Sequence, residues 1–170
     1  QRYIRINGRN CRNPFFYKKD FREKVKDLLC DTSEFALIHG DCTFSNTMVD
    51  SNLNIIFLDP RGYFGFQELC GDEYYDWAKV YYSIYGDYDQ FNNKNFALQI
   101  KEREIFLDIK TNGWKEVGDY FLSRIKNCNP TKIKFLHAII WLSLTTYAWE
   151  DYDSICGAFY NGTYLLEEVL

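Results

Sequence analysis

The sequence predicts an α+β fold that is mostly helical, with small β-hairpins that carry polar loops. Apolar residues between positions 21 and 29 recur at the i, i+4, i+7, i+8 spacing of one helix face. Short β-rich runs flank the turn-like segment 50–54, which indicates a hairpin that ends on Asp59. After Pro130 the chain contains long apolar stretches, which predict core helices. Together these patterns predict one domain over residues 1–170.

Each remaining segment predicts an element of its own. A short apolar run at 35–38 predicts a buried strand, and the three glycines and one proline of 60–71 predict a loop. Asp72 is expected to cap a helix whose apolar stripe includes Trp77, and residues 86–95 are polar and turn-rich. Alternation or helical spacing predicts the other elements: a second hairpin from 96–100 and 105–109, and helices at about 114–126, 131–149 and 153–169.

Composition limits the classes of partner. The chain has a net charge of −4 and no basic run, so no nucleic-acid partner is expected. Its locally basic stretch from Arg2 to Lys26 predicts a solvated face rather than a phosphate-binding one. The longest apolar stretch, 135–144, is too short to cross a bilayer, so no membrane partner is expected. Six scattered cysteines without a CxxC pair predict reduced thiols and a cytoplasmic protein.

Three polar residues in the middle of the chain have the chemistry that metal-assisted phosphoryl transfer needs. Asp41, in a polar loop, can accept the proton of an attacking hydroxyl. Asn46 follows five residues later and can turn its amide oxygen toward the same cavity. Asp59, at the end of the hairpin, adds a hard anionic oxygen for Mg²⁺. Because Mg²⁺ takes only one or two protein oxygens besides water and phosphate, Asn46 and Asp59 suffice as ligands.

The segments HGDCTFSN, IIFLDPRG and GDEYYDWAKVYYSIYGDYD, within residues 36–89, resemble the C-terminal lobe of the aminoglycoside phosphotransferase and choline kinase family. The resemblance implies a protein-kinase-like fold and transfer of the γ-phosphate of ATP or GTP to a hydroxyl of an amino alcohol, a sugar or an aminoglycoside. It implies that Asp41 is the catalytic base and that Asn46 and Asp59 bind Mg²⁺. It also implies that His39 braces the loop that carries Asp41, and that the Asp76 carboxylate holds this loop in place from behind the residues that touch the substrate and the metal.

The chain departs from the family pattern in two places. Pro60 and Arg61 follow Asp59 where protein kinases carry Phe-Gly. Arg61 is therefore expected to touch a phosphate or the substrate, or else to pair with a carboxylate, and Ser45 is a second candidate for a phosphate or substrate contact. No glycine-rich loop or strand lysine precedes residue 36. Residues 1–170 are thus expected to be a fragment or C-terminal domain, with the N-terminal lobe elsewhere in the same full-length chain and weak ATP binding without it.

Other interpretations of these residues stay open. His39 and Asp41 could be ligands of a metallohydrolase, although the only other histidine, His137, lies on an apolar helix face and is expected in the core. Asp41 and Asn46 could be turn formers, and Asp72 is well explained as a helix cap. The alternative function is a non-catalytic, pseudokinase-like ligand-binding module within a larger, possibly fused, pathway protein.

A cluster of aromatic and acidic residues near the C-terminus is the candidate acceptor pocket. Trp149, Asp151 and Asp153 could surround an amine or quaternary ammonium, since aromatic faces and carboxylates attract cations. In that case a cationic alcohol is the expected acceptor. The simpler alternative is a solvated acidic helix end.

Overall fold

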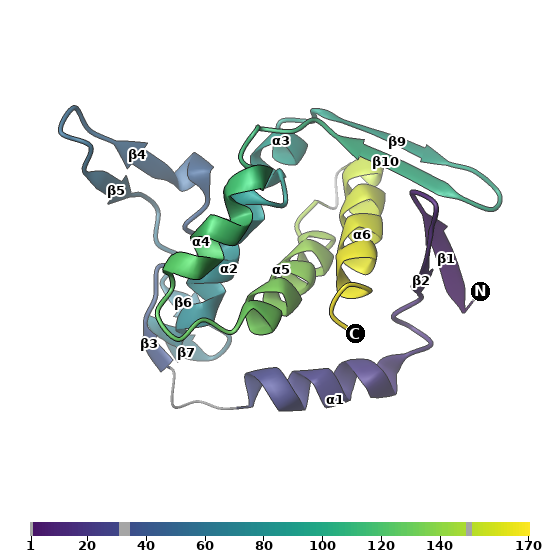
Figure 1. Cartoon of the computed structure of the whole chain (residues 1–170), viewed down its shortest axis with the longest axis horizontal. Coiled ribbons are helices and arrows are strands. Elements are labelled where there is room, and N and C mark those ends of the chain that lie inside the picture. The colour runs from purple at the N-terminus through teal and green to yellow at the C-terminus, as the bar shows by residue number, and fades with distance from the viewer. Residues whose placement is uncertain (1, 31–34, 149–150) are drawn as a thin grey trace.

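The computed structural model describes residues 2–30, 35–148 and 151–170 and has the α+β fold that the sequence predicts. Helices hold about 44% of the residues and strands about 21%, so helix is the more abundant element but makes up less than half of the chain. The helices are α1 Lys18–Leu29, α2 Glu73–Ile84, α3 Tyr88–Asn92, α4 Gly118–Arg124, α5 Pro130–Leu144, α6 Tyr152–Leu166 and the 3₁₀ turns η1 Phe44–Asn46 and η2 Lys115–Val117. The strands, shown with them in Figure 1, are β1 Tyr3–Ile6, β2 Arg9–Arg12, β3 Phe35–Leu37, β4 Thr47–Val49, β5 Ile55–Phe57, β6 Tyr63–Phe64, β7 Gln67–Glu68, β8 Cys70–Asp72, β9 Phe96–Ile100 and β10 Ile105–Ile109.

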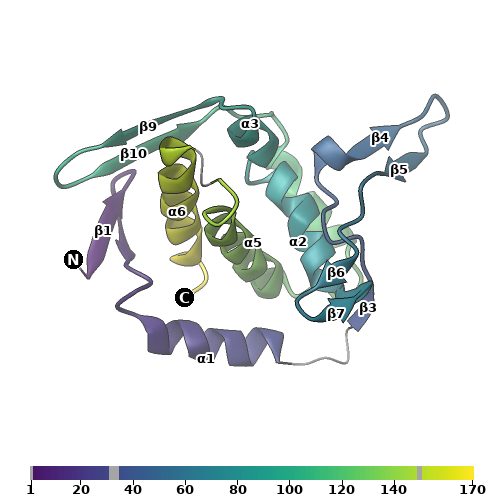
Figure 2. The same cartoon turned by 180° about the vertical axis from the view of Figure 1, so that it is seen from behind.

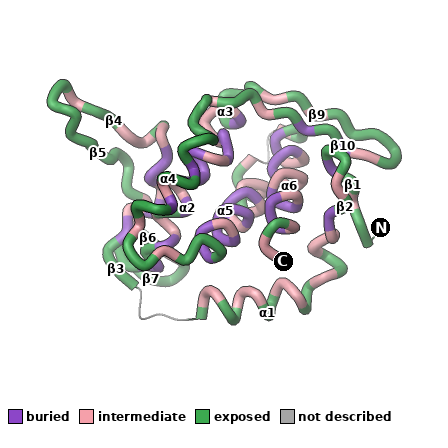
Figure 3. The backbone as a smooth tube through the Cα atoms, in the orientation of Figure 1, coloured by how far each residue is buried: buried purple, intermediate pink, exposed green. Residues whose placement is uncertain are grey.

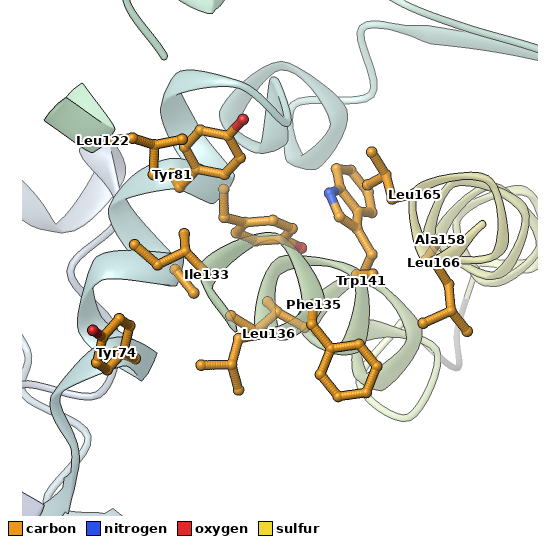
Figure 4. Close-up of a cluster of buried hydrophobic side chains, with 14 of the residues drawn as sticks. Tyr74, Tyr81, Leu122, Ile133, Phe135, Leu136, Trp141, Ala158, Leu165 and Leu166 are labelled. Atoms are coloured by element: carbon orange, nitrogen blue, oxygen red, sulfur yellow. The ribbon is translucent and has the colours of Figure 1, made fainter. Parts of the chain in front are cut away.

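The main core lies where α5 packs between α2 and α6 (Figure 4). Helix α5 is apolar around most of its circumference, which is typical of a helix buried on several sides. Tyr82 and Trp141 are fully buried there, with ring centroids 4.9 Å apart in an edge-to-face arrangement. Gly162 lets α6 approach α5 closely, because a Cβ at this position would lie 2.9 Å from the backbone nitrogen of Leu142.

His137 is a core residue of α5, as the sequence predicts. It is 1% exposed, and its Nε2 accepts a hydrogen bond from Trp141 Nε1 at 3.0 Å. Burial, with a smaller contribution from Lys115, lowers the pKa of His137 to about 3. The neutral ring is therefore the form that the folded state holds.

This lowered pKa predicts that acid destabilises the protein. The unfolded chain binds a proton at His137 near pH 6.5 and the folded protein only near pH 3. Between these values the free energy of unfolding should fall by up to about 1.4 kcal/mol per pH unit, or about 2 kcal/mol at pH 5. Urea titrations from pH 7 to 5 measure this slope. His137→Gln should flatten it, whereas an unchanged slope would assign the acid sensitivity to other groups.

A four-stranded sheet of order β2-β1-β10-β9 lies beside α6, and its N-terminal half is absent from the sequence prediction. Strands β9 and β10 form the predicted hairpin, while β1 joins β10 in parallel through Ile6 and Ile105. These two residues and Cys11 are buried and form a second small core, against which Tyr160 and Tyr164 of α6 pack. The basic N-terminal segment thus contributes two strands as well as the amphipathic helix α1.

Several predictions of local structure are wrong in detail. The segment at 35–38 forms strand β3, but Leu37 is 76% exposed because β3 pairs only with the short strand β8. Residues 60–71 contain a small hairpin and the start of β8 rather than an open loop, and residues 86–95 contain helix α3. Trp77, expected in the apolar stripe of α2, is 37% exposed at the surface.

The β4–β5 hairpin forms as predicted and projects away from the helices in both views (Figures 1 and 2). Most of its residues are exposed (Figure 3), including apolar side chains such as Val49, Ile55 and Phe57. An uncovered apolar surface of this kind is typical of an interaction site.

The described part of the chain contains no helix that is both long and apolar enough to cross a membrane. All six cysteines have free thiols, and Cys11 and Cys42 are buried.

Candidate active site

The loop that carries Asp41 is held by the carboxylate of Asp76. Asp76 lies in the first turn of α2, and its two oxygens accept hydrogen bonds from the backbone N–H groups of His39 and Gly40, both at 2.7 Å. The thiol of Cys42 donates to the backbone oxygen of the same aspartate at 3.2 Å. One residue of α2 thus fixes the loop at three points.

Gly40 has a specific structural role in this loop. Its φ of +80° lies in the left-handed region that side chains disfavour, and an added Cβ would lie 2.9 Å from Cβ of Arg61. The backbone N–H of Arg61 donates to the carbonyl of His39 at 2.8 Å. The segment after the hairpin therefore packs directly on the loop, and only glycine leaves the necessary space.

The side chain of His39 contacts the loop that carries Asp41 and the neighbouring strand β5. Its Nδ1 accepts a hydrogen bond from the backbone N–H of Asp41 at 3.2 Å, and its ring packs against Phe57, 5.5 Å between centroids. Its Nε2 is buried without a hydrogen-bond partner among the residues that the structure describes. The other histidine, His137, is in the core, so the described chain offers no second histidine beside Asp41 for a metallohydrolase centre.

Two hydrogen bonds and one ion pair hold Asp41. Asn46 Nδ2 donates to the Asp41 carbonyl at 2.9 Å and to its Oδ2 at 3.2 Å. Lys79 Nζ, from α2, forms an ion pair with Oδ1 at 2.8 Å. The Asp41 side chain nevertheless remains 39% exposed, so one side of the carboxylate stays open to a small molecule.

A cavity of about 350 Å³ opens above Asp41, and Asp59, Arg61 and Lys79 line it as well. Asp59 follows β5 and has a φ of +56°, a left-handed conformation that aspartate adopts more readily than most residues. The N–H of Leu58, the residue before it, donates to the carbonyl of Asn46 at 2.8 Å. This hydrogen bond holds the start of the Asp59 segment beside Asn46, which is hydrogen-bonded to Asp41 but is not among the residues that line the cavity.

The donor set at this place suits Mg²⁺. The Asp59 carboxylate and the amide oxygen of Asn46 are hard oxygen ligands of the type that Mg²⁺ binds in proteins. Within the described ranges no group of three or more His, Cys, Asp or Glu side chains could hold a metal by itself. A site made from Asn46 and Asp59 therefore needs phosphate and water oxygens to complete its coordination.

Arg61 lines the cavity, and three tyrosines hold its guanidinium in place. Its guanidinium donates to the hydroxyls of Tyr75 at 3.2 Å and Tyr147 at 2.6 Å, and it lies 5.0 Å from the ring centroid of Tyr63. Ser45, the other candidate for a phosphate contact, is exposed and is not among the residues that line this cavity. Its N–H donates to Asp89 of α3 at 3.0 Å.

A larger cavity, of about 720 Å³, adjoins the first and shares with it Tyr88, Leu144 and Tyr147. Asp151 lines this cavity, but Asp153 lies exposed on the first turn of α6 and does not. Trp149 falls outside the residues that the structure describes. Of the two candidate acceptor residues that the structure describes, Asp151 lines a cavity that adjoins the one at Asp41, and Asp153 does not.

The carboxylate of Asp151 already has partners. It caps α6 by accepting from the N–H groups of Asp153 and Ser154, and it forms an ion pair with Lys94. The hydrogen bonds from Lys94 and from the Ser154 hydroxyl lower the pKa of Asp151 to about 2. Asp151 is therefore a paired anion at a helix end, and its negative charge is balanced on the cavity side by Lys94.

Sequence reasoning missed Lys79 and Tyr88, whereas Tyr147, which lines both cavities with Tyr88, belongs to the aromatic C-terminal surface that the sequence suggests for the acceptor. Lys79 lies three residues after Asp76, so the two side chains share one face of α2. That spacing, read together with the predicted role of Asp76, is the signal that could have found it. No comparable signal points to Tyr88, because its position depends on how α3 packs.

Comparisons with protein-family models, with curated proteins and with solved structures find no significant match to this chain.

Proposed function

We propose that this chain is the C-terminal, protein-kinase-like lobe of a small-molecule kinase, which transfers the γ-phosphate of ATP or GTP to a hydroxyl of a small metabolite. The observation that carries the proposal is the cavity that Asp41 and Asp59 line together, with Asn46 in contact with Asp41. Two residues that the sequence resemblance selects for phosphoryl transfer, Asp41 and Asp59, are 18 positions apart and line one cavity of suitable chemistry.

In this mechanism each residue of the chain has a separate task. Asp41 accepts a hydrogen bond from the acceptor hydroxyl through its exposed side, orients that hydroxyl and takes its proton. Asn46 and Asp59 would hold Mg²⁺, which supplies charge neutralisation on the phosphate oxygens when it is bound. Asp76 keeps the loop in place, so that the rate comes from positioning and electrostatics.

The acceptor is proposed to lie in the larger cavity, with its hydroxyl directed past Tyr88 and Tyr147 toward Asp41. The two cavities share these side chains, so the larger one adjoins the cavity that Asp41 lines. A hydroxyl-bearing acceptor fits the aromatic faces and the polar groups of Asn92 and Lys94. A cationic acceptor gains less binding energy from Asp151 than the sequence suggested, because Lys94 already neutralises this carboxylate.

The exposed β4–β5 hairpin supports the proposal of a second lobe. Its apolar side chains Met48, Ile56 and Leu58 are 41–55% exposed and lead directly to Asp59. Exposed apolar surface next to a polar cavity is usually covered by a further part of the protein or by a ligand. An N-terminal lobe in the same full-length chain would cover this hairpin and complete the nucleotide site.

The test is the magnesium-dependent transfer of phosphate from ATP or GTP to a panel of amino alcohols, sugars and aminoglycosides. It uses the longest natural chain that contains residues 1–170. Asp59→Asn should weaken magnesium-dependent ATP binding by about 10- to 100-fold, the scale seen when groups that support a bound metal are removed. Asp50→Asn is the matched control, since Asp50 lies in the turn of the same hairpin and bonds only to its own turn residues.

Magnesium-dependent binding without transfer to any acceptor would favour the non-catalytic, ligand-binding module instead. Equal effects of the Asp59 and Asp50 substitutions would remove Asp59 from the metal site and contradict the proposed arrangement.

A further inference from the structure

We infer that Lys79 binds the terminal phosphate of the nucleotide and links it to Asp41. The inference rests on the proposed function, because it assigns a new residue to the same site. It starts from the position of the Lys79 ammonium, which lies 2.8 Å from Asp41 Oδ1 and lines the cavity that Asp59 and Arg61 also line.

Phosphoryl transfer poses an electrostatic problem at this cavity. The carboxylate of Asp41 and the terminal phosphate must both approach the same acceptor hydroxyl, and two anions at that separation repel each other. Asn46 and Asp59 place the proposed magnesium ion on the side of the hairpin. A cation on the side of α2 is needed to offset the repulsion close to Asp41, and Lys79 occupies that position.

The Lys79 ammonium has hydrogen-bonding capacity for both anions. An ammonium carries three N–H donors, and one is used by Asp41 Oδ1. Because Lys79 lines the cavity, a further donor of its ammonium is expected to reach a phosphate oxygen there without breaking the ion pair. The contact to Asp41 therefore positions the cation without removing the carboxylate from use, since the Asp41 side chain stays partly exposed and each of its oxygens can accept a further hydrogen bond.

The surroundings of Lys79 hold its side chain in place. Only 12% of the side chain is exposed, and the ammonium lies 6.0 Å and 5.5 Å from the ring centroids of Tyr75 and Tyr82. These tyrosines are at positions i−4 and i+3 on the same helix, so they flank the lysine stem. A lysine held in this way loses little conformational freedom when a phosphate binds.

Arg61, the other cation of the cavity, is less suited to this role. Its guanidinium is bound to the hydroxyls of Tyr75 and Tyr147 and stacks near Tyr63. It joins the hairpin side of the cavity to the end of α5, and reaching a phosphate beside Asp41 would require it to leave these partners. Lys79 is therefore the group that we assign to the transferred phosphate.

The experiment compares two probes, magnesium tripolyphosphate and magnesium pyrophosphate, by calorimetric titration of the longest natural chain that contains residues 1–170. Lys79→Met removes the charge but keeps a side chain of similar length between the tyrosines, and Lys79→Arg keeps the charge. Lys79→Met should weaken tripolyphosphate binding by about 10- to 100-fold, the value of one charge-assisted hydrogen bond, and change pyrophosphate binding little. Lys79→Arg should retain most of the preference for the longer probe.

Lys101→Met is the matched control, because Lys101 also lies near an aromatic ring, that of Phe106, but outside the cavity. It should leave the affinity for both probes unchanged, and thermal melting should confirm that each variant is folded. If Lys79→Met binds both probes as tightly as the wild type does, or binds both more weakly by the same factor, this inference alone is overturned. Failure of the wild type to bind either probe would overturn the proposed function, and this inference with it.

Discussion

Asp41→Asn should lower kcat for phosphate transfer by about 10²- to 10⁴-fold, the usual contribution of a positioned acid–base group. The substitution keeps the size of the side chain but removes the oxygen that takes the hydroxyl proton. The fold should survive, because the Asp41 side chain is 39% exposed and its loop is held through the backbone by Asp76. Single-turnover rates at saturating ATP and acceptor measure the effect on the chemical step.

The control for this variant is Asp27→Asn, which removes one exposed carboxylate from α1, a helix that contributes no residue to the cavity at Asp41. Its rate should equal that of the wild type. Magnesium binding should be retained in Asp41→Asn, since Asn46 and Asp59 are unchanged. A rate within a few-fold of the wild type would remove Asp41 from the mechanism and leave only a structural role for the loop.

Local sequence patterns predicted the elements whose partners are near in sequence. The β4–β5 and β9–β10 hairpins formed as expected because each strand pairs with its immediate neighbour across a short turn. Helix α1 and the capping of α2 by Asp72 also agree, since helical spacing and caps are properties of a few adjacent residues. The same local logic grouped Asp41, Asn46 and Asp59, because a single hairpin connects them.

Features that depend on distant parts of the chain were not predictable in this way. The parallel pairing of β1 with β10 joins Ile6 to Ile105, and nothing in either segment identifies the other. Glycine is a poor helix former, so helix propensity gives no reason for Gly162 in α6, where it allows the close approach of α5. Lys79 acquires its importance only because Asp76 fixes the loop and so brings Asp41 within 2.8 Å of its ammonium.

Asp76→Ala should lower the free energy of unfolding by about 2–5 kcal/mol, because two partly buried N–H donors lose a charged acceptor at once. These donors belong to His39 and Gly40, each 2.7 Å from a carboxylate oxygen. Asp76→Asn keeps one acceptor oxygen and should lose about half as much. Urea titrations of both variants measure these differences, and phosphate transfer, measured where each variant is folded, should fall with them because the loop no longer holds Asp41 in position.

Glu73→Ala provides the comparison, since Glu73 is also an acidic residue in the first turn of α2 but is exposed. Its loss removes only the interaction with the helix dipole, about 0.3–1 kcal/mol. If Asp76 acts through the loop, its substitution costs several times more than that of Glu73 and affects kcat as well. Equal costs for the two variants would mean that Asp76 contributes mainly as an acidic residue at a helix start, and that the loop holds its shape through other contacts, such as the hydrogen bond from Arg61 to His39.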